Sequence, residues 1–485
     1  MNTNNQSNSP RRLGGLRSVL ATALLLAVPA QYAQAAATIV ILNTNAAGVG
    51  FNDPTPVAPV GGNTGTTLGQ QRLIAFQYAA NIWGATLTSS VPIVIDASFV
   101  ALSCTATSAV LGSAGATAVF SDFTNAGFAG TWYPFALANK LSGINQDATL
   151  AQIRARFNVN LGSTGCLTGS PFYLGLDNNH GTAVDLVVVL LHEFGHGLGF
   201  QTFTSGSTGA QLANQPSIWD RFLLDTITNK NWVDDTAGER AASALAVNKL
   251  VWTGANVTGA APLVLSPGTP YLGISGPNAG AAAGTYVVGT ASFGAPLSTT
   301  PVISQLMPVT TQVGGTGPGC DPFNAANTLA VRGNVALIDR GVCAFTAKVK
   351  NAQLAGAIGV VIANNVAGSP PPGLGGSDPT INIPAVSVTL ADATTLRGQL
   401  TRRSRTASGV VAEIGVNGAQ LAGADLAGRL KMFTPNPFQG GSSVSHWDSS
   451  ATRNLLMEPA INADLTQSLI PPQDLTFRLL QDIGW

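Results

Sequence analysis

Apolar and polar positions follow two different rhythms in the first third of the chain. Residues 68–87 ("LGQQRLIAFQYAANIWGATL") carry apolar side chains at the spacing of one helix face: Leu73, Phe76, Ala80 and Trp83. The stretch "VPIVIDASFV" at 91–100 is rich in β-branched residues and predicts a strand. The chain therefore begins as an α+β structure.

The pattern changes in the second half. From about residue 251 to 318, short runs of Gly, Pro, Ala, Val and Thr predict β-strands joined by loops. The segment "NVALIDRGVCAFTAKVKNAQLAGAIGVVIANN" then predicts a strand at 335–338, a helix at 344–355 and a strand at 359–363. A compact βαβ unit is expected there.

A third apolar run, "VVLLHEFGHGLGF" at 188–200, carries candidate chemistry. Histidines four residues apart lie on one side of a helix, so His192 and His196 can reach one metal ion. Glu193 lies beside the first histidine, where it can act on an activated water. This chain has four histidines and four glutamates, so a chance HExxH arrangement is improbable.

The start and the glycines of this helix have their own explanations. Thr182 and Asp185 have the spacing of a capping box before "LVVVLL", whose apolar character predicts a helix buried on most sides. Glycine costs up to about 1 kcal/mol inside a helix, so three glycines need a reason. Close backbone packing at Gly195 and Gly197, and a left-handed turn at Gly199, would supply it.

The third metal ligand is missing from the helix motif. An HExxHxxGxxH pattern would place a histidine at 202, where this chain has Thr202. His180 is expected in a loop near the start of the helix, far from His192. His446 remains, in "GGSSVSHWDSSATRNLLMEPAI", eleven residues before Met457. Two alternatives stay open, a glutamate ligand at Glu239 or an aspartate ligand at Asp220.

"HEFGHGLGF", "SHW" and "LLMEP" together resemble the leishmanolysin-type metzincins, in which inserted sequence separates the third histidine from the helix. The resemblance implies that His192, His196 and His446 bind one catalytic Zn²⁺. It implies that Glu193 is the general base and that Met457 forms a turn beneath the metal. The tyrosine that follows this turn in some metzincins is absent, because Glu458 and Pro459 stand there.

The βαβ segment, with Cys320 upstream, resembles the protease-associated (PA) domain. Such modules are attached to or inserted into secreted and membrane peptidases and carry no catalytic residues. The resemblance implies a role in substrate or partner contact, and a spacer that shapes access to the cleft is the alternative.

Composition and the N-terminus place the protein outside the cytoplasm. Arg11, Arg12 and Arg17 precede an apolar run that is too short to span a bilayer, and "AQA" at 33–35 supplies small residues for cleavage. A twin-arginine signal at Arg11 and Arg12 fits less well. We expect a secreted protein, periplasmic or extracellular, with no transmembrane anchor after signal removal.

The charge balance argues against a nucleic-acid partner, and the cysteines indicate disulfide bonds. Only 9% of residues are charged and the formal net charge is zero, so no basic field for nucleic acid is present. The one basic cluster, Arg402, Arg403 and Arg405, is interpreted as a solvated loop. Four cysteines allow three pairings. Proximity in sequence favours two disulfides, one between Cys104 and Cys166 and one between Cys320 and Cys343.

These observations predict an α+β metzincin-like zinc peptidase domain that is interrupted by a β-rich α/β PA domain. The expected boundaries are a signal peptide at 1–36, catalytic parts at 37–250 and 416–485, and the insertion at 251–415. The expected function is a monomeric zinc endopeptidase acting on proteins or peptides. A non-enzymatic secreted binding or adhesion protein with a decayed metal site is the alternative. Structural Ca²⁺ has no support in the sequence and stays open.

Overall fold

A computed structural model describes residues 36–310, 317–462 and 464–485. Almost all of the expected signal segment, residues 1–35 with Arg11, Arg12, Arg17 and "AQA", lies outside these ranges. In the described part of the chain, no helix is both long and apolar enough to cross a membrane.

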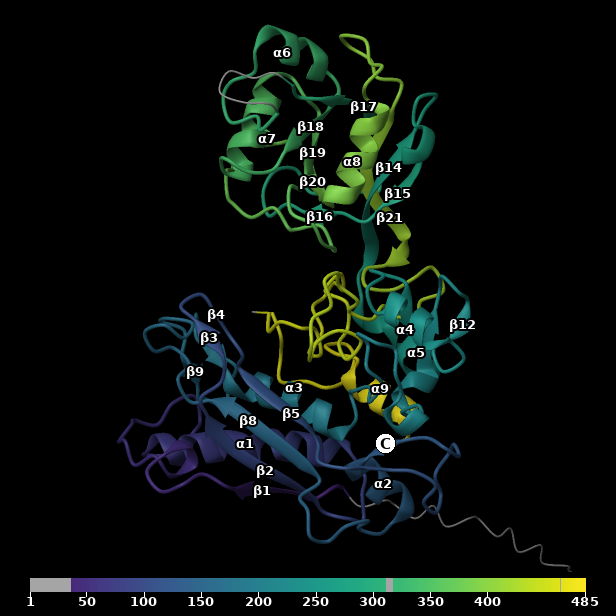
Figure 1. Ribbon diagram of the computed structural model, residues 1–485. Helices are drawn as coiled ribbons and strands as arrows, with labels where there is room; N and C mark the ends of the chain where they lie inside the picture. The colour runs from purple at the N-terminus through teal and green to yellow at the C-terminus, as the bar shows by residue number, and fades with distance from the viewer. Residues whose placement is uncertain (1–35, 311–316, 463) are drawn as a thin grey trace, which may run out of the picture. The chain divides into compact units, whose positions relative to one another are not determined.

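A four-stranded sheet lies in the first lobe, whose core residues come from 37–265 and 424–483 (Figure 1). The first three strands in the order β1-β2-β8-β5 run parallel, and β5 pairs antiparallel with β8 at the edge. The expected strand at 91–100 is confirmed as β2. The strands are β1 (Ile39–Asn43), β2 (Ile93–Val100), β8 (Ile153–Asn158) and β5 (Gly112–Ala116).

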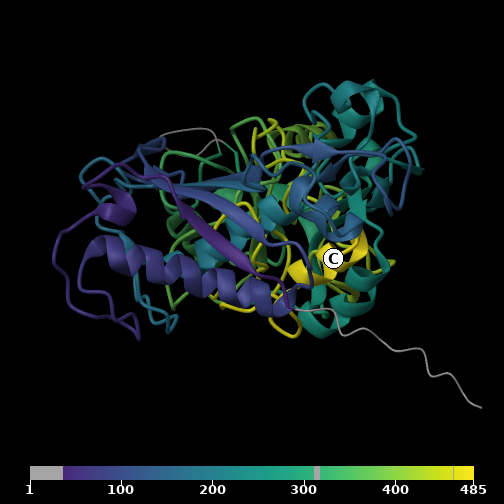
Figure 2. The same cartoon turned by 90° about the horizontal axis from the view of Figure 1, so that it is seen from below.

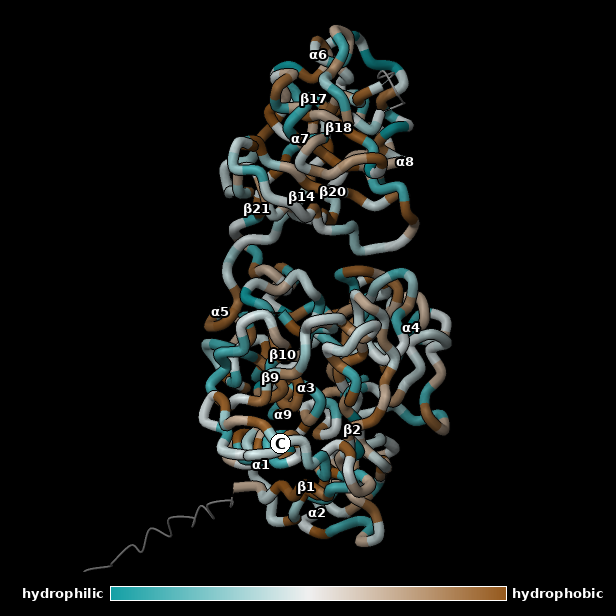
Figure 3. The backbone as a smooth tube through the Cα atoms, turned by 90° about the vertical axis from the view of Figure 1, so that its left-hand side faces the viewer, coloured by the Kyte–Doolittle hydropathy of each residue, from teal (hydrophilic) through white to brown (hydrophobic). Residues whose placement is uncertain are grey.

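Two long helices pack with this sheet. The expected first helix is α1 (Leu68–Thr86), which Figure 2 shows as one unbroken helix near β1. Phe76, Ala80 and Trp83 are buried, whereas Leu73 is 39% exposed and lies off the buried face. The second helix, α3 (Leu186–Leu198), is buried at all its positions, and it begins with six hydrophobic residues, a class that Figure 3 colours brown.

The remaining elements of the first lobe cover this core. They are α2 (Phe135–Ser142), α4 (Ala237–Ser243), α5 (Ala255–Val264) and α9 (Thr476–Ile483), with β11 (Leu223–Asp225), β12 (Lys230–Asn231) and β13 (Leu250–Trp252). The chain end closes onto the long buried helix, because the Trp485 indole N–H donates to the Leu198 carbonyl at 2.8 Å. Short two-residue strands include β3 (Cys104–Thr105), β4 (Ser108–Ala109), β9 (Phe172–Tyr173) and β10 (Val184–Asp185).

Helix α5 departs from the expectation of strands and loops at 251–318. Its composition is poor for a helix, with Gly259 and Pro262 inside it, but Val257, Ala261 and Val264 pack into the core of the first lobe. The Asp482 carboxylate accepts hydrogen bonds from the backbone of Asn256 and Val257, which satisfies two amides at the start of the helix. Tertiary packing thus overrides local propensity here.

An eight-stranded sheet forms the second lobe, in the order β15-β14-β21-β17-β18-β19-β20-β16. Alternate residues of β18 (Val335–Asp339) enter two separate cores, so both faces of the sheet are covered. The predicted βαβ unit is confirmed, with α7 at Phe345–Leu354 and β19 at Gly359–Ala363. The other elements are β14 (Pro267–Ser275), β15 (Gly284–Tyr286), β16 (Gly289–Thr290), β17 (Val302–Pro308), α6 (Ala325–Val331), β20 (Ala385–Val388), α8 (Leu390–Gln399) and β21 (Val411–Leu421).

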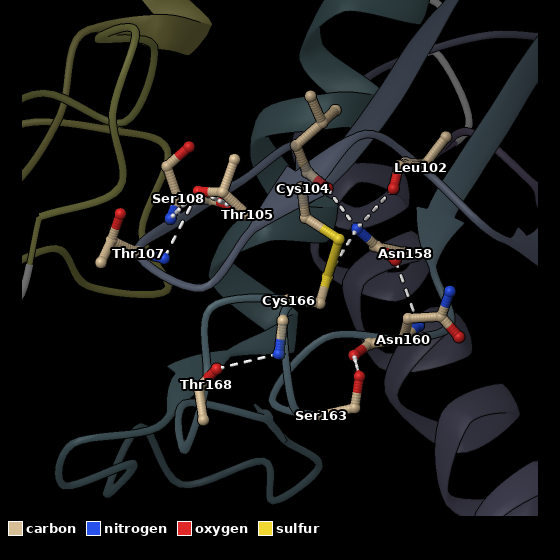
Figure 4. The surroundings of a disulfide bond; sticks show 12 residues. Leu102, Cys104, Thr105, Thr107, Ser108, Asn158, Asn160, Ser163, Cys166 and Thr168 are labelled. Atoms are coloured by element: carbon tan, nitrogen blue, oxygen red, sulfur yellow. Dashed lines mark hydrogen bonds between the residues drawn. A yellow bond between two sulfur atoms is a disulfide. The ribbon is translucent and has the colours of Figure 1, made fainter.

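Both predicted disulfides are confirmed. Cys104 bonds to Cys166, and Cys320 bonds to Cys343. Figure 4 shows the first disulfide beside Asn158, whose side-chain amide donates to the carbonyls of Leu102 and Val110. The disulfide and this amide fix the hairpin β3–β4. The basic cluster Arg402, Arg403 and Arg405 lies in the turn and loop between α8 and β21, as expected.

Gly197 is required by packing against the sheet. A Cβ atom added at Gly197 would lie 2.4 Å from Cγ2 of Ile153, which is fully buried on β8. We expect Gly197→Ala to lower the free energy of unfolding by about 1–3 kcal/mol, because the extra methyl group overpacks the interface. Gly238→Ala in α4 is the matched control, since a Cβ there meets nothing within 4 Å. Denaturant unfolding compares the two, and equal stability would contradict the packing explanation.

Candidate metal centre

Helix α3 starts three residues later than the capping-box prediction required. Asp185 is the N-cap itself, and its carboxylate accepts from the backbone N–H groups of Val187 and Val188 at 2.8 and 3.2 Å. Thr182 lies outside the helix, so the predicted Thr182–Asp185 box is wrong. The helix ends at Gly199, whose φ of 130° confirms the expected turn that favours glycine.

The structure brings three histidines together from distant parts of the chain. His192 and His196 project from α3, and His446 comes from the loop after β21. Their Nε2 atoms are 3.1 to 3.2 Å apart in all three pairs. Each residue is at most 8% exposed. Among the described residues, this is the one group of three or more His, Cys, Asp or Glu side chains that could hold a metal ion.

Backbone carbonyls orient all three rings. Nδ1 of His192 contacts the Leu456 carbonyl at 2.7 Å, and Nδ1 of His196 contacts the Phe200 carbonyl at 2.7 Å. Nδ1 of His446 contacts the Ser442 carbonyl at 2.9 Å. A carbonyl only accepts, so each Nδ1 carries the proton and each Nε2 presents a lone pair. The three lone pairs therefore meet at one point.

This convergence fits a metal ion. Burial lowers the pKa of His192 to about 4 and that of His196 to about 3, and it lowers the pKa of His446 well below its ordinary value. The rings are thus neutral near pH 7, and three unprotonated nitrogens cannot hydrogen-bond to one another. Zinc–imidazole bonds of about 2.0–2.1 Å at tetrahedral angles would separate the nitrogens by about 3.3 Å, close to the spacing found.

Glu193 lies next to the histidines, against the edge strand β5. A Cβ atom added at Gly112 would come within 3.0 Å of its carboxylate, so the strand passes close to it. Burial raises the pKa of Glu193 to about 8, and a backbone hydrogen bond from Ala114 lowers it in part. A nearby cation would lower this pKa further and favour the carboxylate that a general base requires.

Met457 packs against α3 at Gly195, on the helix that carries His192 and His196. It is fully buried, and its sulfur would lie 3.0 Å from a Cβ atom added at Gly195. The absence of a side chain at Gly195 lets this close contact form. Leu456, the preceding residue, supplies the carbonyl that orients His192, so the turn also fixes a histidine.

The alternative ligands lie elsewhere. Glu239 closes a capping box with Thr236 at the start of α4 and pairs with Lys230 at 2.7 Å. Asp220 is fully buried and accepts hydrogen bonds from Thr202, Thr204 and Ser217. Neither belongs to the histidine group. His180 lies in a loop, as expected, and its Nδ1 contacts the Ala183 carbonyl.

A cavity of about 1190 Å³ opens at the three histidines. Its walls come from β5, the hairpin β3–β4, the start of α3, the segment after α3 and the turn after Met457. The residues that line it include His192, Glu193, His196 and His446, with Gly112, Ser113 and Ala114 of β5 and Glu458 and Pro459 of the turn.

Known proteins match parts of this chain. Residues 302–396 match the PA domain family. A probable lipoprotein aminopeptidase, LpqL of Mycobacterium tuberculosis (strain ATCC 25618 / H37Rv), is 30% identical over 178 residues, which is 37% of this chain and 29% of LpqL.

Two solved structures show partial similarity. An aminopeptidase from Aneurinibacillus sp. strain AM-1 is 27% identical over 32% of this chain and 31% of that chain, with a TM-score of 0.24. BSAP, a zinc aminopeptidase from Bacillus subtilis, is 21% identical over 33% and 35% of the two chains, with a TM-score of 0.23. This chain therefore spans about a third of the length of these relatives.

Sequence reasoning missed several residues of the site. The carbonyls of Leu456, Phe200 and Ser442 carry no residue-type signal, because any amino acid supplies a carbonyl. The approach of β5 to Glu193 depends on sheet order, which the local pattern does not give. Asp220 carried one usable signal, since it directly follows Ile218 and Trp219, two large apolar residues that predict a buried segment.

Glu458 makes the folded state sensitive to pH. Its carboxylate accepts from the Leu455 backbone and from Asn462, and burial raises its pKa from 4.5 to about 8. Between these values the folded state holds a proton that the unfolded chain releases, so stability is full below about pH 4.5 and falls as pH rises toward 8. The slope is at most about 1.4 kcal/mol per pH unit.

Glu458→Gln removes this titration, so its free energy of unfolding should fall less steeply between pH 5 and 8 than that of the parent. Glu239→Gln is the control, because Lys230 holds the pKa of Glu239 at about 2, below this window. Denaturant unfolding at several pH values measures the slopes. Identical slopes in the parent and Glu458→Gln would contradict the assignment.

Proposed function

We propose that this protein is a zinc-dependent endopeptidase of the metzincin type, with His192, His196 and His446 as zinc ligands and Glu193 as general base. The observation that carries the proposal is the meeting of three neutral, carbonyl-oriented imidazoles beside a buried glutamate in a large cavity. The partial similarity to a probable lipoprotein aminopeptidase supports peptidase chemistry.

The residues divide the reaction between them. A zinc ion held by His192, His196 and His446 would lower the pKa of a bound water toward about 7 and would polarise a carbonyl oxygen. Glu193, as a carboxylate, takes the proton of the attacking water and then delivers it to the leaving amine. The Leu456, Phe200 and Ser442 carbonyls keep the imidazoles in one tautomer throughout. Met457 contributes packing beneath α3 and no ligand atom.

Strand β5 offers a place for the peptide. It is an edge strand, pairing with β8 on one side, and Gly112, Ser113 and Ala114 line the cavity. The free edge of a sheet can take an extended peptide as an added strand. Such a peptide would pass Glu193, which lies against the same strand. We infer that substrate binds along β5 with its scissile carbonyl at the histidines.

The charges of the cavity favour internal cleavage over aminopeptidase activity. An aminopeptidase has to hold the cationic α-amino group of its substrate. The acidic side chains that line the cavity are Asp185, Glu193 and Glu458. Asp185 caps α3 and Glu458 is held by its own turn, which leaves Glu193 with its catalytic role. The similarity to aminopeptidases makes removal of single N-terminal residues the second candidate.

The chain segments that build the catalytic part can also be proposed. Residues of α5 and the following Leu265 share the core of the first lobe, and so does Ala424. Pro267 pairs with Leu421 where β14 and β21 leave that core. We therefore propose that the insertion runs from about 267 to 421 and not over the expected 251–415. This range includes the matched PA segment, 302–396. Export from the cytoplasm agrees with two disulfides.

His446→Ala tests the third ligand. A site left with two histidines should lose zinc during dialysis against a mild chelator, since catalytic zinc normally has three protein ligands. Glu239→Ala should keep zinc at the parent level, because Glu239 lies outside the histidine group. Zinc per chain is measured by elemental analysis. Retention by His446→Ala together with loss by Glu239→Ala would contradict the proposed ligand set.

Glu193→Gln tests the base and the mode of cleavage in one assay. The substrate is a denatured protein with an acetylated N-terminus, and new N-termini are mapped by mass spectrometry. The parent should cut internal bonds. The variant should retain zinc, but its rate of cleavage should fall about 10²–10⁴-fold, because an amide cannot accept the proton. An active variant would contradict the mechanism. A parent that cleaves only unblocked N-termini would show aminopeptidase activity instead.

A further inference from the structure

Thr202 stands where the HExxHxxGxxH pattern has its third histidine, and in this chain it makes a different contact. The Thr202 hydroxyl donates to Oδ1 of Asp220 at 2.6 Å, and the Thr204 hydroxyl donates to Oδ2 at 2.6 Å. The Ser217 backbone N–H also donates to Oδ2, at 2.8 Å. Asp220 is fully buried, so its carboxylate gathers three donors away from water. Residues 202–204 are thereby tied to a rigid point in the core.

The same segment contacts two of the three histidines. The Phe200 carbonyl orients His196 at 2.7 Å. The Thr202 backbone N–H donates to the Ser445 hydroxyl at 3.3 Å, and Ser445 immediately precedes His446. The side chain of Thr202 thus reaches Asp220 while its main chain reaches the segment that carries the distant histidine. Thr204 shares the first contact and lacks the second.

Aromatic packing holds the segment at the same two places. The Phe200 ring contacts Trp219, beside Asp220, with ring centroids 4.8 Å apart. It also contacts Trp447, beside His446, at 5.1 Å. All three rings are buried. Polar and apolar contacts therefore connect the residues around Asp220 to the residues around His446.

We propose that Asp220, acting through Thr202 and Ser445, is a positioning residue that holds His446 against the two helix histidines. The inference rests on the proposed zinc site. It explains why a histidine brought back after 250 residues needs an additional anchor, since no helix turn fixes its distance from His196. Asp220 touches neither the metal nor the substrate in this account.

The test measures the rate of zinc release into excess chelator from zinc-loaded protein. Thr202→Val removes the hydroxyl that binds Asp220, and Ser445→Ala removes the acceptor of the Thr202 N–H. Each should speed zinc release several-fold. Because both break one chain of contacts, the double variant should release zinc no faster than the faster single variant. Thr202→Ser keeps the hydroxyl and should restore the parent rate.

Thr204→Val is the matched control. It removes a hydrogen bond to the same carboxylate, whereas Thr202→Val also removes the acceptor of the Thr204 backbone N–H. Thr204→Val should therefore lose at most as much thermal stability as Thr202→Val, and its zinc release should stay near the parent rate. Combined with Ser445→Ala, it should give only the Ser445→Ala effect. Asp220→Asn should speed zinc release as Thr202→Val does. If Asp220→Asn fails to fold, the Thr202→Val and Ser445→Ala variants still test the proposal.

Two failures can be told apart. If the parent binds no zinc, the proposed function fails and the positioning role fails with it. If the parent binds zinc and His446→Ala releases it, but Thr202→Val and Ser445→Ala behave like the parent, only the positioning role is overturned. Multiplying effects in the double variant, or equal effects of Thr202→Val and Thr204→Val, would likewise overturn it.

Discussion

Three imidazole nitrogens facing one another in a buried site impose the strongest constraint on this structure. Each ring donates its Nδ1 proton to a backbone carbonyl, so the Nε2 lone pairs of His192, His196 and His446 have no partner but a cation. Burial keeps the rings neutral, which removes competition by protons near pH 7. The surrounding glycines, carbonyls and turns can be understood as the means of holding this arrangement.

Much of the packing around α3 follows from that constraint. Gly195 admits the Met457 sulfur, Gly197 admits Ile153, and Gly199 ends the helix so that the Phe200 carbonyl can turn back to His196. The second lobe does not disturb the arrangement, because its first and last strands, β14 and β21, pair with each other. A large second lobe can thus separate His196 from His446 in sequence without separating them in space.

The sequence predicted the parts whose signals are local. His192, Glu193 and His196 lie on one helix, so their spacing in the sequence was sufficient to predict that they lie together. The βαβ unit at 335–363 had an equally local pattern. His446 required a different argument, from the scarcity of histidines and from the resemblance around Met457. The start of α3 was misplaced because Thr182 and Asp185 both suit an N-cap, and only the observed hydrogen bonds distinguish them. Helix α5 could not be predicted, since its Gly and Pro disfavour a helix and only packing against the rest of the core stabilises it.

The central claim is a single zinc ion bound by three imidazoles. X-ray absorption at the zinc edge, on purified protein loaded with one equivalent of zinc, tests it most directly. The account predicts three histidine nitrogens at about 2.0–2.1 Å and a remaining light-atom ligand, with one histidine lost in His446→Ala. A sulfur ligand, fewer than three imidazoles in the parent, or an unchanged spectrum in His446→Ala would contradict it.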